Sequence, residues 1–406
     1  MGKSRGAIRV VPRYSGSRVT VEIRELSRSI WFKWRGPESF ISAAPENDNY
    51  ALLAALPVAM ARGSNLHVCG SVDTKLLASA ERYSQIWGQW VPTRYKPVYV
   101  SADRELDSDN VGAAGRDWLY PLSGGVDSLF AVHTNLSGRA GRENRQPGAA
   151  FLVRGLDYPL TDSALFPRLE RRVEKTARTL NLPLLICETN WKDFCIQYEL
   201  DTLLALAAVA HTMAGSYAGV AVAADFTYGE DLKVMPWGNA QYLPHLLSSP
   251  HFQVVGSGAE STRLDKLRYL SAVPEVLSRL AVCQRTDSRE GRMNCGKCEK
   301  CIRTAMGLIA ATGDTAEVFP ERPTLPQVAL LGTLSPIDMI FWRDILRQLP
   351  AQMWPMRLVI GSLIARSRIA NALTGIFQPF EKKYIRPAHH NFKKWIGAVP
   401  SATDQQ

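Results

Sequence analysis

The sequence predicts an α/β protein built on a doubly wound parallel sheet, and three observations point to that fold class. From Trp118 onward, short apolar stretches alternate with longer stretches whose apolar residues follow helical spacing. Several of the short stretches are continuously apolar, which is typical of strands buried on both faces of a parallel sheet. The chain of 406 residues is long enough for such a core and for smaller units at either end.

Residues 1–112 precede this alternating region and predict a small N-terminal α+β domain. Apolar and polar residues alternate in three of its segments, as in an antiparallel meander; these are 8–12, 18–23 and 29–34. Further helices and strands are expected over 50–61, 66–70, 75–87 and 97–100. His67 and Cys69 lie close together here, and we interpret them as core residues, because a pair alone provides too few ligands for a metal site.

The region 113–312 is expected to form the α/β domain, after a polar, glycine-containing linker over 103–115. Its strands are expected near 118–122, 148–155, 183–188, 219–223 and 252–255. Ligands of a parallel sheet bind outside the carboxyl ends of the strands. That rule places Ser123–Ser128, Arg154–Tyr158 and Glu188–Trp191 around one cleft.

The functional interpretation depends on one strand-to-helix turn, Ser123-Gly124-Gly125-Val126-Asp127-Ser128. The backbone N–H groups of such a turn point into the space above it, and the helix N-terminus adds a partial positive charge. The glycines have no Cβ to hold a phosphate away, and the serines add hydroxyl donors. Asp127 would repel a bare phosphate but is suited to bind Mg²⁺. The turn therefore predicts a site for a phosphate group with its magnesium ion.

Four cysteines, Cys283, Cys295, Cys298 and Cys301, form the pattern C-x11-C-x2-C-x2-C. Thiolates at this spacing can surround one Zn²⁺ ion, because an x2 spacing folds into a tight knuckle around a metal. The region 283–301 therefore predicts a structural zinc knuckle. The alternative that the pattern leaves open is an iron–sulfur cluster or a cysteine that carries sulfur.

The hexapeptide SGGVDS at 123–128 resembles the hallmark SGGxDS of the PP-loop ATP pyrophosphatase superfamily. The resemblance implies an adenine nucleotide alpha hydrolase-like fold and cleavage of Mg²⁺-bound ATP between its α and β phosphates. Asp127 and Ser128 would then be catalytic. The residues that would bind ATP are Ser123, Gly124, Gly125, Val126, Asp127 and Ser128, with Val153 and Arg154 at the adenine ring.

The loop and the cysteine pattern together resemble the 7-cyano-7-deazaguanine synthases, over about residues 117–311. This resemblance implies an AMP-forming ligase that adenylates a small carboxylate or purine-like substrate and then transfers ammonia to it. The chain departs from that family in its N-terminal domain, its longer spacing before the triple cysteine and its C-terminal extension. Fold and ATP chemistry are therefore expected to transfer better than the substrate.

Two other functions stay open. The first is a nucleic-acid thiolation enzyme of the PP-loop class, in which the cysteines carry sulfur. The second is a nucleotide-binding subunit that recruits partners in a bacterial defence or polysaccharide system. Asp225, Glu230 and Asp231, after the strand at 219–223, can face substrate or magnesium, or form a solvated acidic loop. Arg263 or Lys266 is a candidate to contact the leaving pyrophosphate.

Residues 313–406 predict a helical, basic C-terminal extension, with helices over 337–349 and 357–377. It can lie on a membrane surface or bind RNA, but we favour packing against the core or a partner chain. The net charge of +10 permits a nucleic-acid partner without identifying one.

We expect no membrane contact, because glycines interrupt the apolar stretch 203–224, which is typical of a helix followed by a buried strand. The absence of a secretory signal and the odd number of cysteines, seven, predict a cytoplasmic protein. A homo-oligomer or a partner protein from the same gene cluster stays open.

Overall fold

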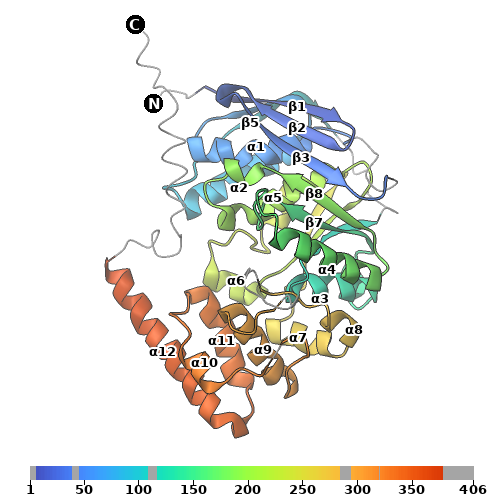
Figure 1. Ribbon diagram of the computed structural model, residues 1–406. Coiled ribbons are helices and arrows are strands. Elements are labelled where there is room, and N and C mark those ends of the chain that lie inside the picture. The colour runs from blue at the N-terminus through green and yellow to red at the C-terminus, as the bar shows by residue number, and fades with distance from the viewer. Residues whose placement is uncertain (1–5, 39–44, 108–116, 284–293, 320, 378–406) are drawn as a thin grey trace.

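The computed structural model describes residues 6–38, 45–107, 117–283, 294–319 and 321–377. Within these ranges, ten strands form one mostly parallel sheet (Figure 1). The strands are β1 (Ile8–Ser15), β2 (Arg18–Ile23), β3 (Arg28–Arg35), β4 (Leu66–Asp73), β5 (Val100–Leu106), β6 (Trp118–Pro121), β7 (Pro147–Arg154), β8 (Leu184–Thr189), β9 (Gly219–Ala223) and β10 (Gln253–Ser257).

The α-helices of the described residues cover the two faces of the sheet and one end of the molecule. They are α1 (Asn49–Arg62), α2 (Thr74–Trp90), α3 (Val126–Leu136), α4 (Leu165–Thr179), α5 (Tyr198–His211), α6 (Tyr228–Val234), α7 (Arg263–Ser271), α8 (Pro274–Leu277), α9 (Glu299–Thr312), α10 (Leu325–Ala329), α11 (Pro336–Gln348) and α12 (Trp354–Phe377).

The second half of the chain forms five adjacent parallel strands in the order β10-β9-β6-β7-β8. The chain starts at β6, adds β7 and β8 on one side, and then returns to add β9 and β10 on the other. This order is that of a doubly wound sheet, and the strand order reverses between β6 and β9. The predicted α/β class is confirmed at this level.

The first half of the chain extends the same sheet instead of forming a second one. β3 pairs antiparallel with β8, and β2, β1, β4 and β5 follow in that order. β1–β3 form the predicted antiparallel meander. The expected domain boundary near residue 112 thus falls between two halves of one sheet, because strand pairing across β3 and β8 joins them. β5 also occupies the start of the expected linker, and 108–115 lie outside the described residues.

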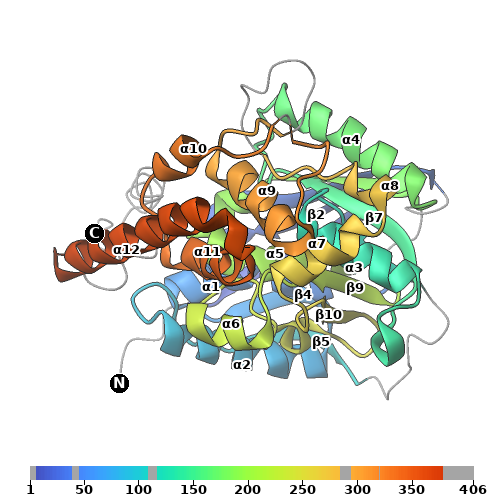
Figure 2. The ribbon, with the colours of Figure 1, turned by 90° about the horizontal axis from the view of Figure 1, so that it is seen from below.

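Two hydrophobic clusters show how the sheet is covered. One cluster runs along a single face of both halves, under α1, α2 and α5. The other covers the opposite face of the second half only, under α3, α4 and α7. In Figure 2 the helices α3 and α4 lie on one side of the strands and α1 and α2 on the other. On the face of β1–β5 that points away from the first cluster, the described residues belong to neither cluster.

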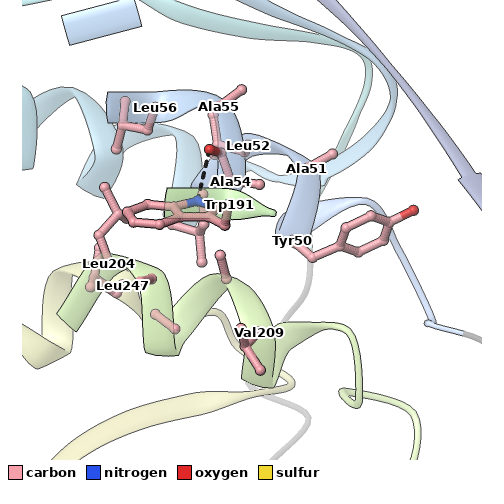
Figure 3. Packing of buried hydrophobic residues seen from close by; sticks show 14 of the residues in the cluster. Tyr50, Ala51, Leu52, Ala54, Ala55, Leu56, Trp191, Leu204, Val209 and Leu247 are labelled. Atoms are coloured by element: carbon pink, nitrogen blue, oxygen red, sulfur yellow. Dashed lines mark hydrogen bonds between the residues drawn. The ribbon is translucent and has the colours of Figure 1, made fainter. Parts of the chain in front are cut away.

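Trp191 fixes the first cluster where the two halves meet. Its indole is fully buried between α1 and α5, and its Nε1 donates a hydrogen bond to the carbonyl oxygen of Ala54 at 3.1 Å (Figure 3). Trp34 of β3 makes a similar bond, since its Nε1 donates to Thr212 Oγ1 at 2.8 Å. Both buried N–H groups are therefore satisfied by residues more than a hundred positions away in sequence.

The C-terminal helices pack on the second cluster, at the end of the molecule opposite β1 and β2 (Figure 1). Trp342 of α11 is buried, and its Nε1 donates to Glu299 Oε1 of α9 at 2.8 Å. The described part of the extension thus follows the packing arrangement that the sequence favours, and residues 378–406 lie outside the described ranges. None of the described helices combines the length and apolar character needed to cross a membrane.

A buried carboxyl group joins the two halves of the chain on the first cluster. Asp201 of α5 is buried, and its Oδ2 accepts a hydrogen bond from the hydroxyl of Tyr95 at 2.9 Å. Burial raises the pKa of Asp201 to about 7. The carboxyl group therefore stays protonated in the folded protein over a pH range in which an exposed aspartate is ionised.

This raised pKa predicts a pH-dependent effect of Asp201→Asn. The unfolded chain releases the Asp201 proton near pH 4 and the folded chain only near pH 7, so the carboxyl group's contribution to stability falls as pH rises between these values. Asparagine does not titrate. The free energy of unfolding of the variant, measured relative to that of the natural protein, should therefore rise with pH by up to ~4 kcal/mol. Urea unfolding at pH 4, 5.5 and 8 measures the difference, and a constant difference would contradict the prediction.

Candidate functional site

The turn between β6 and α3 has the backbone that a phosphate-binding loop needs. Gly124 has φ +78°, a left-handed conformation that favours glycine. Gly125 has φ −75° and precedes the first residue of α3. A Cβ atom on Gly125 would meet only Ser123 Oγ, at 3.5 Å, so the space above this backbone is open. The first N–H groups of the 11-residue helix point into that space without helical partners.

Two hydroxyl groups flank these amides. Ser128 Oγ donates to the carbonyl oxygen of Gly125 at 3.1 Å and lies 3.3 Å from Ser123 Oγ. The Gly125 N–H reaches Ser123 Oγ at 3.4 Å, a long contact that a better acceptor can replace. The sequence-predicted residues Ser123 to Ser128 thus form one continuous group of donors at the carboxyl end of β6.

Asp127 is held by two cations from α7. Its Oδ2 accepts a charge-assisted hydrogen bond from Arg263, and its Oδ1 lies 3.1 Å from Lys266 Nζ. The Lys266 side chain is only 1% exposed, and its Nζ also donates to the carbonyl oxygen of Ala224 at 2.6 Å. This ammonium group therefore joins the loop to the residue after β9. The predicted Mg²⁺ role of Asp127 stays a prediction, and the carboxylate is already paired in this state.

Of the three acidic residues after β9, only Asp225 lines the pocket beside the loop. Its Oδ2 accepts hydrogen bonds from Trp237 Nε1 at 3.0 Å and Asn239 Nδ2 at 3.1 Å. Burial raises the pKa of Asp225, and the nearby Asp127 raises it further. Glu230 caps the start of α6, and Asp231 accepts from the Gln241 N–H at 2.7 Å, so both serve local structure.

A pocket of about 210 Å³ opens beside the loop, at the carboxyl ends of β6, β7 and β9. It therefore lies where the strand order reverses, as expected for a doubly wound sheet. The loop contributes Ser123, Gly125, Asp127 and Ser128, and β7 contributes Val153. Val153 thus lies beside the loop, and its contact with an adenine ring stays a prediction.

Arg154 does not line this pocket. Its Nη2 donates to the carbonyl oxygens of Leu160 and Asp162, each at 2.7 Å, and its Nη1 lies 3.4 Å from Glu188 Oε1. These bonds hold the guanidinium against the loop that follows β7. Arg154 alternates with Val153 along the strand, so the two side chains leave on opposite faces of the sheet.

The end of β8 and the residues after it also lie outside the pocket, contrary to the expectation for 188–191. Trp191 is buried under α1, and Glu188 is the register partner of Lys33 in β3, with its carboxylate beside Arg154. The added antiparallel strand β3 and helix α1 cover this end of β8. The sequence did not indicate that pairing, because β3 lies more than a hundred residues earlier in the chain.

Asp157, within the range 154–158 that was expected at the cleft, lines the pocket. Burial raises the pKa of Asp157, and Tyr198 is its hydrogen-bond partner. Three other polar residues of the pocket were not predicted from the sequence. Tyr198 and Thr202 come from the first turns of α5, and Asn239 follows α6. α5 had no usable signal, since its composition indicates only a buried helix.

The four predicted cysteines come together in one cluster, and their Sγ atoms all lie within 4.8 Å of one another. Cys283 and Cys298 are 3.8 Å apart, as are Cys295 and Cys301. Four sulfurs bound tetrahedrally at about 2.3 Å from one Zn²⁺ ion would be about 3.8 Å apart. The donor set and its spacing therefore fit a single zinc ion.

The backbone around the cluster supports this interpretation. The N–H groups of Lys297 and Cys298 donate to Cys295 Sγ at 3.4 and 3.3 Å, which stabilises a thiolate. The hydrogen bond between Cys298 and Cys301 lowers the pKa of Cys298 and raises the pKa of Cys301, so these two sulfurs share one proton.

The cluster is joined to the loop Ser123–Ser128 through a short segment. Asn294, the residue before Cys295, accepts from the Val282 N–H at 2.9 Å and donates to the carbonyl oxygen of Leu280 at 2.8 Å. Between them, the Ala281 N–H donates to the carbonyl oxygen of Gly124 at 2.8 Å. The segment that leads into Cys283 therefore supports the backbone of the loop.

Comparisons with known proteins identify no relative: no family model, curated protein or solved structure matches the chain.

Metal loading of the cluster gives a direct test of its geometry. Cys295→Ser should remove one Zn²⁺ per chain and lower the thermal midpoint, because metal binding contributes directly to folding stability. Metal content by plasma mass spectrometry and thermal unfolding measure both effects. Cys195→Ser is the matched control, because Cys195 lies outside the cluster. Equal zinc content in both variants, or iron with labile sulfide in the natural protein, would contradict a four-thiolate zinc site.

Proposed function

We propose that the protein is an ATP-dependent, AMP-forming ligase or amidotransferase of the PP-loop class. It would adenylate a small carboxylate or carbonyl substrate and release pyrophosphate. The observation that carries the proposal is the loop Ser123–Ser128, whose glycines leave its amides open beside a pocket at the reversal of strand order. Anionic groups bind at such helix N-termini because N–H donors and the helix dipole act together.

The loop residues would bind the phosphates of ATP. The amides of Gly124 to Ser128 and the hydroxyls of Ser123 and Ser128 supply neutral donors, and Arg263 and Lys266 supply positive charge behind Asp127. The Asp127 carboxylate would hold the magnesium ion that accompanies ATP, and that ion would neutralise part of the phosphate charge. Asp225 is a further carboxyl group of the pocket and is held in place by Trp237 and Asn239.

The remaining pocket would hold the group that is activated. Its apolar wall includes Val153, and its polar wall includes Asp157, Tyr198 and Thr202. A small planar substrate with hydrogen-bonding edges fits such a mixed lining, since a few placed polar groups set orientation in an apolar pocket. Catalysis would come mainly from positioning, because an acyl-adenylate is itself reactive.

The cysteine cluster supports a ligase over a thiolation enzyme. Sulfur pairs 3.8 Å apart suit four thiolates on one ion, which leaves none free to carry sulfur. Several irons would bind separate thiolates and hold them farther apart. In the proposed enzyme the zinc has a structural role, through the contact between Ala281 and Gly124.

The products formed from ATP test this proposal. The full-length, zinc-loaded protein is incubated with ATP labelled in the α-phosphate, Mg²⁺, ammonium and a panel of small carboxylates that includes heteroaromatic acids. We expect AMP and pyrophosphate in equal amounts with at least one acid, and mass spectrometry of the reaction should detect the amide. Formation of ADP and phosphate instead would contradict cleavage at the α-phosphorus.

Gly125→Ala should impair phosphate binding without impairing folding. The fold should tolerate the added methyl group, because it meets no backbone atom and φ is already −75°. The methyl group would, however, occupy the space above the loop amides. AMP formation should fall about 100-fold, since a displacement of about 1 Å in a reacting group has effects of that size. Gly229→Ala, with nothing within 4 Å of its Cβ, is the control and should retain activity. Equal rates in the two variants would exclude the loop as the phosphate site.

Asp127→Ala should unfold more easily than the natural protein, besides losing activity. It leaves the buried Lys266 ammonium without its carboxylate, and breaking a buried ion pair from one side costs about 3–5 kcal/mol. Glu143→Ala, which removes an exposed partner of Arg145, should change stability by less than about 1 kcal/mol. Urea midpoints measure both, and equal midpoints would show that Lys266 does not depend on Asp127.

A further inference from the structure

The outer face of the first half of the sheet carries a second cluster of metal-binding side chains. Leu66 and Val68 of β4 point into the first hydrophobic cluster, so His67 and Cys69 point to the opposite face, which carries neither hydrophobic cluster among the described residues. The two side chains lie two residues apart on the same face of one strand. The prediction that they are core residues is therefore wrong, since both side chains are partly exposed.

The neighbouring strand adds the ligand that the sequence pattern lacks. β5 runs parallel to β4, with Ser101 as the register partner of His67, and Asp103 lies two residues further along the same face. Asp103 Oδ1 is 2.9 Å from His67 Nε2, and the ligand atoms of His67, Cys69 and Asp103 all lie within 4.8 Å of one another. Strand pairing thus places an imidazole, a thiol and a carboxylate at one point.

The second nitrogen of the imidazole is also held. Ser101 Oγ lies 2.9 Å from His67 Nδ1. A proton on Nδ1, donated to this hydroxyl, leaves the lone pair of Nε2 directed at Asp103 and Cys69. Metal-binding histidines typically have such a partner on their other nitrogen, which fixes the tautomer and the ring orientation.

We propose that His67, Cys69 and Asp103 form a binding site for a divalent transition metal such as Zn²⁺ or Co²⁺. The mixed nitrogen, sulfur and oxygen donor set suits these ions, whereas Mg²⁺ and Ca²⁺ require oxygen ligands. Three protein ligands leave a further coordination position, and the His67 and Asp103 side chains are 28% and 59% exposed, so a solvent or small-molecule ligand can reach it. A thiolate and a carboxylate balance the ion's two positive charges.

The competing arrangement is a plain histidine–aspartate ion pair. That pair needs a proton on His67 Nε2, whereas the metal site needs Nε2 unprotonated, so the two exclude each other at any moment. The ion pair also gives no role to Cys69, whose sulfur lies within reach of both partners.

This site is separate from the four-cysteine cluster and from the proposed ATP pocket. It lies on β4 and β5, at the edge of the sheet farthest from β9 and β10, and shares no residue with either. The proposal therefore does not depend on the proposed ligase function, and its ligands can be changed without altering residues assigned to that function.

Cobalt titration of the full chain tests the site. The protein is first loaded with one equivalent of Zn²⁺, which the four thiolates bind in preference to the three-ligand site, and is then titrated with Co²⁺ while zinc release is followed in the same sample. We expect one Co²⁺ to bind without zinc release and to give a thiolate-to-cobalt charge-transfer band in the near ultraviolet. Cys69→Ser should abolish the band, and His67→Ala and Asp103→Asn should each weaken binding at least about 10-fold.

Cys195→Ser serves as the control and should retain both the band and the affinity, because Cys195 is outside the cluster. Circular dichroism checks that each variant is folded; the substituted side chains are partly or fully exposed. A band that persists in Cys69→Ser, or that appears only as zinc is released, would overturn the proposal. So would the absence of cobalt binding by the natural protein at millimolar Co²⁺.

Discussion

The buried ammonium group of Lys266 is the constraint on which the candidate site depends. Moving such a charge out of water costs several kcal/mol, which is offset here by the Asp127 carboxylate and the Ala224 carbonyl oxygen. One partner belongs to the loop after β6 and the other follows β9. Lys266 therefore fixes the spacing across the reversal of strand order, where the pocket lies. Arg263 adds a second positive charge beside the same carboxylate.

The four-cysteine cluster acts on the same loop from the other side. Because the Ala281 N–H bonds to Gly124, the position of the loop backbone depends on the segment that leads into Cys283. A metal at the cluster would hold that segment by covalent coordination, and Asn294 would hold it by hydrogen bonds. The loop and the cysteine cluster therefore support each other's position, although more than a hundred residues separate them in sequence. This contact gives a physical reason for their presence in one chain.

Local signals carried most of what the sequence could predict. The loop Ser123–Ser128 and the cysteine spacing can be recognised because neighbouring residues alone determine their chemistry. The strand β3 was also recognisable, but its pairing with β8 was not, since nothing in either segment encodes the distant partner. The same limit applies to His67, which looks like a core residue until β5 places Asp103 beside it. Arg154 was predicted to contact a ligand, but its guanidinium group binds the carbonyl oxygens of Leu160 and Asp162 instead. The sequence could not indicate these bonds, because they depend on how the loop after β7 folds.

The central claim is that the loop Ser123–Ser128 binds the phosphates of ATP with the nucleoside directed into the adjoining pocket. A crystal structure with α,β-methylene-ATP and Mg²⁺ tests it most directly, because this analogue cannot be cleaved between the α and β phosphates. The account predicts phosphate density over the amides of Gly124 to Ser128 and the base next to Val153. Nucleotide density at another place in the molecule, with the loop empty, would contradict it.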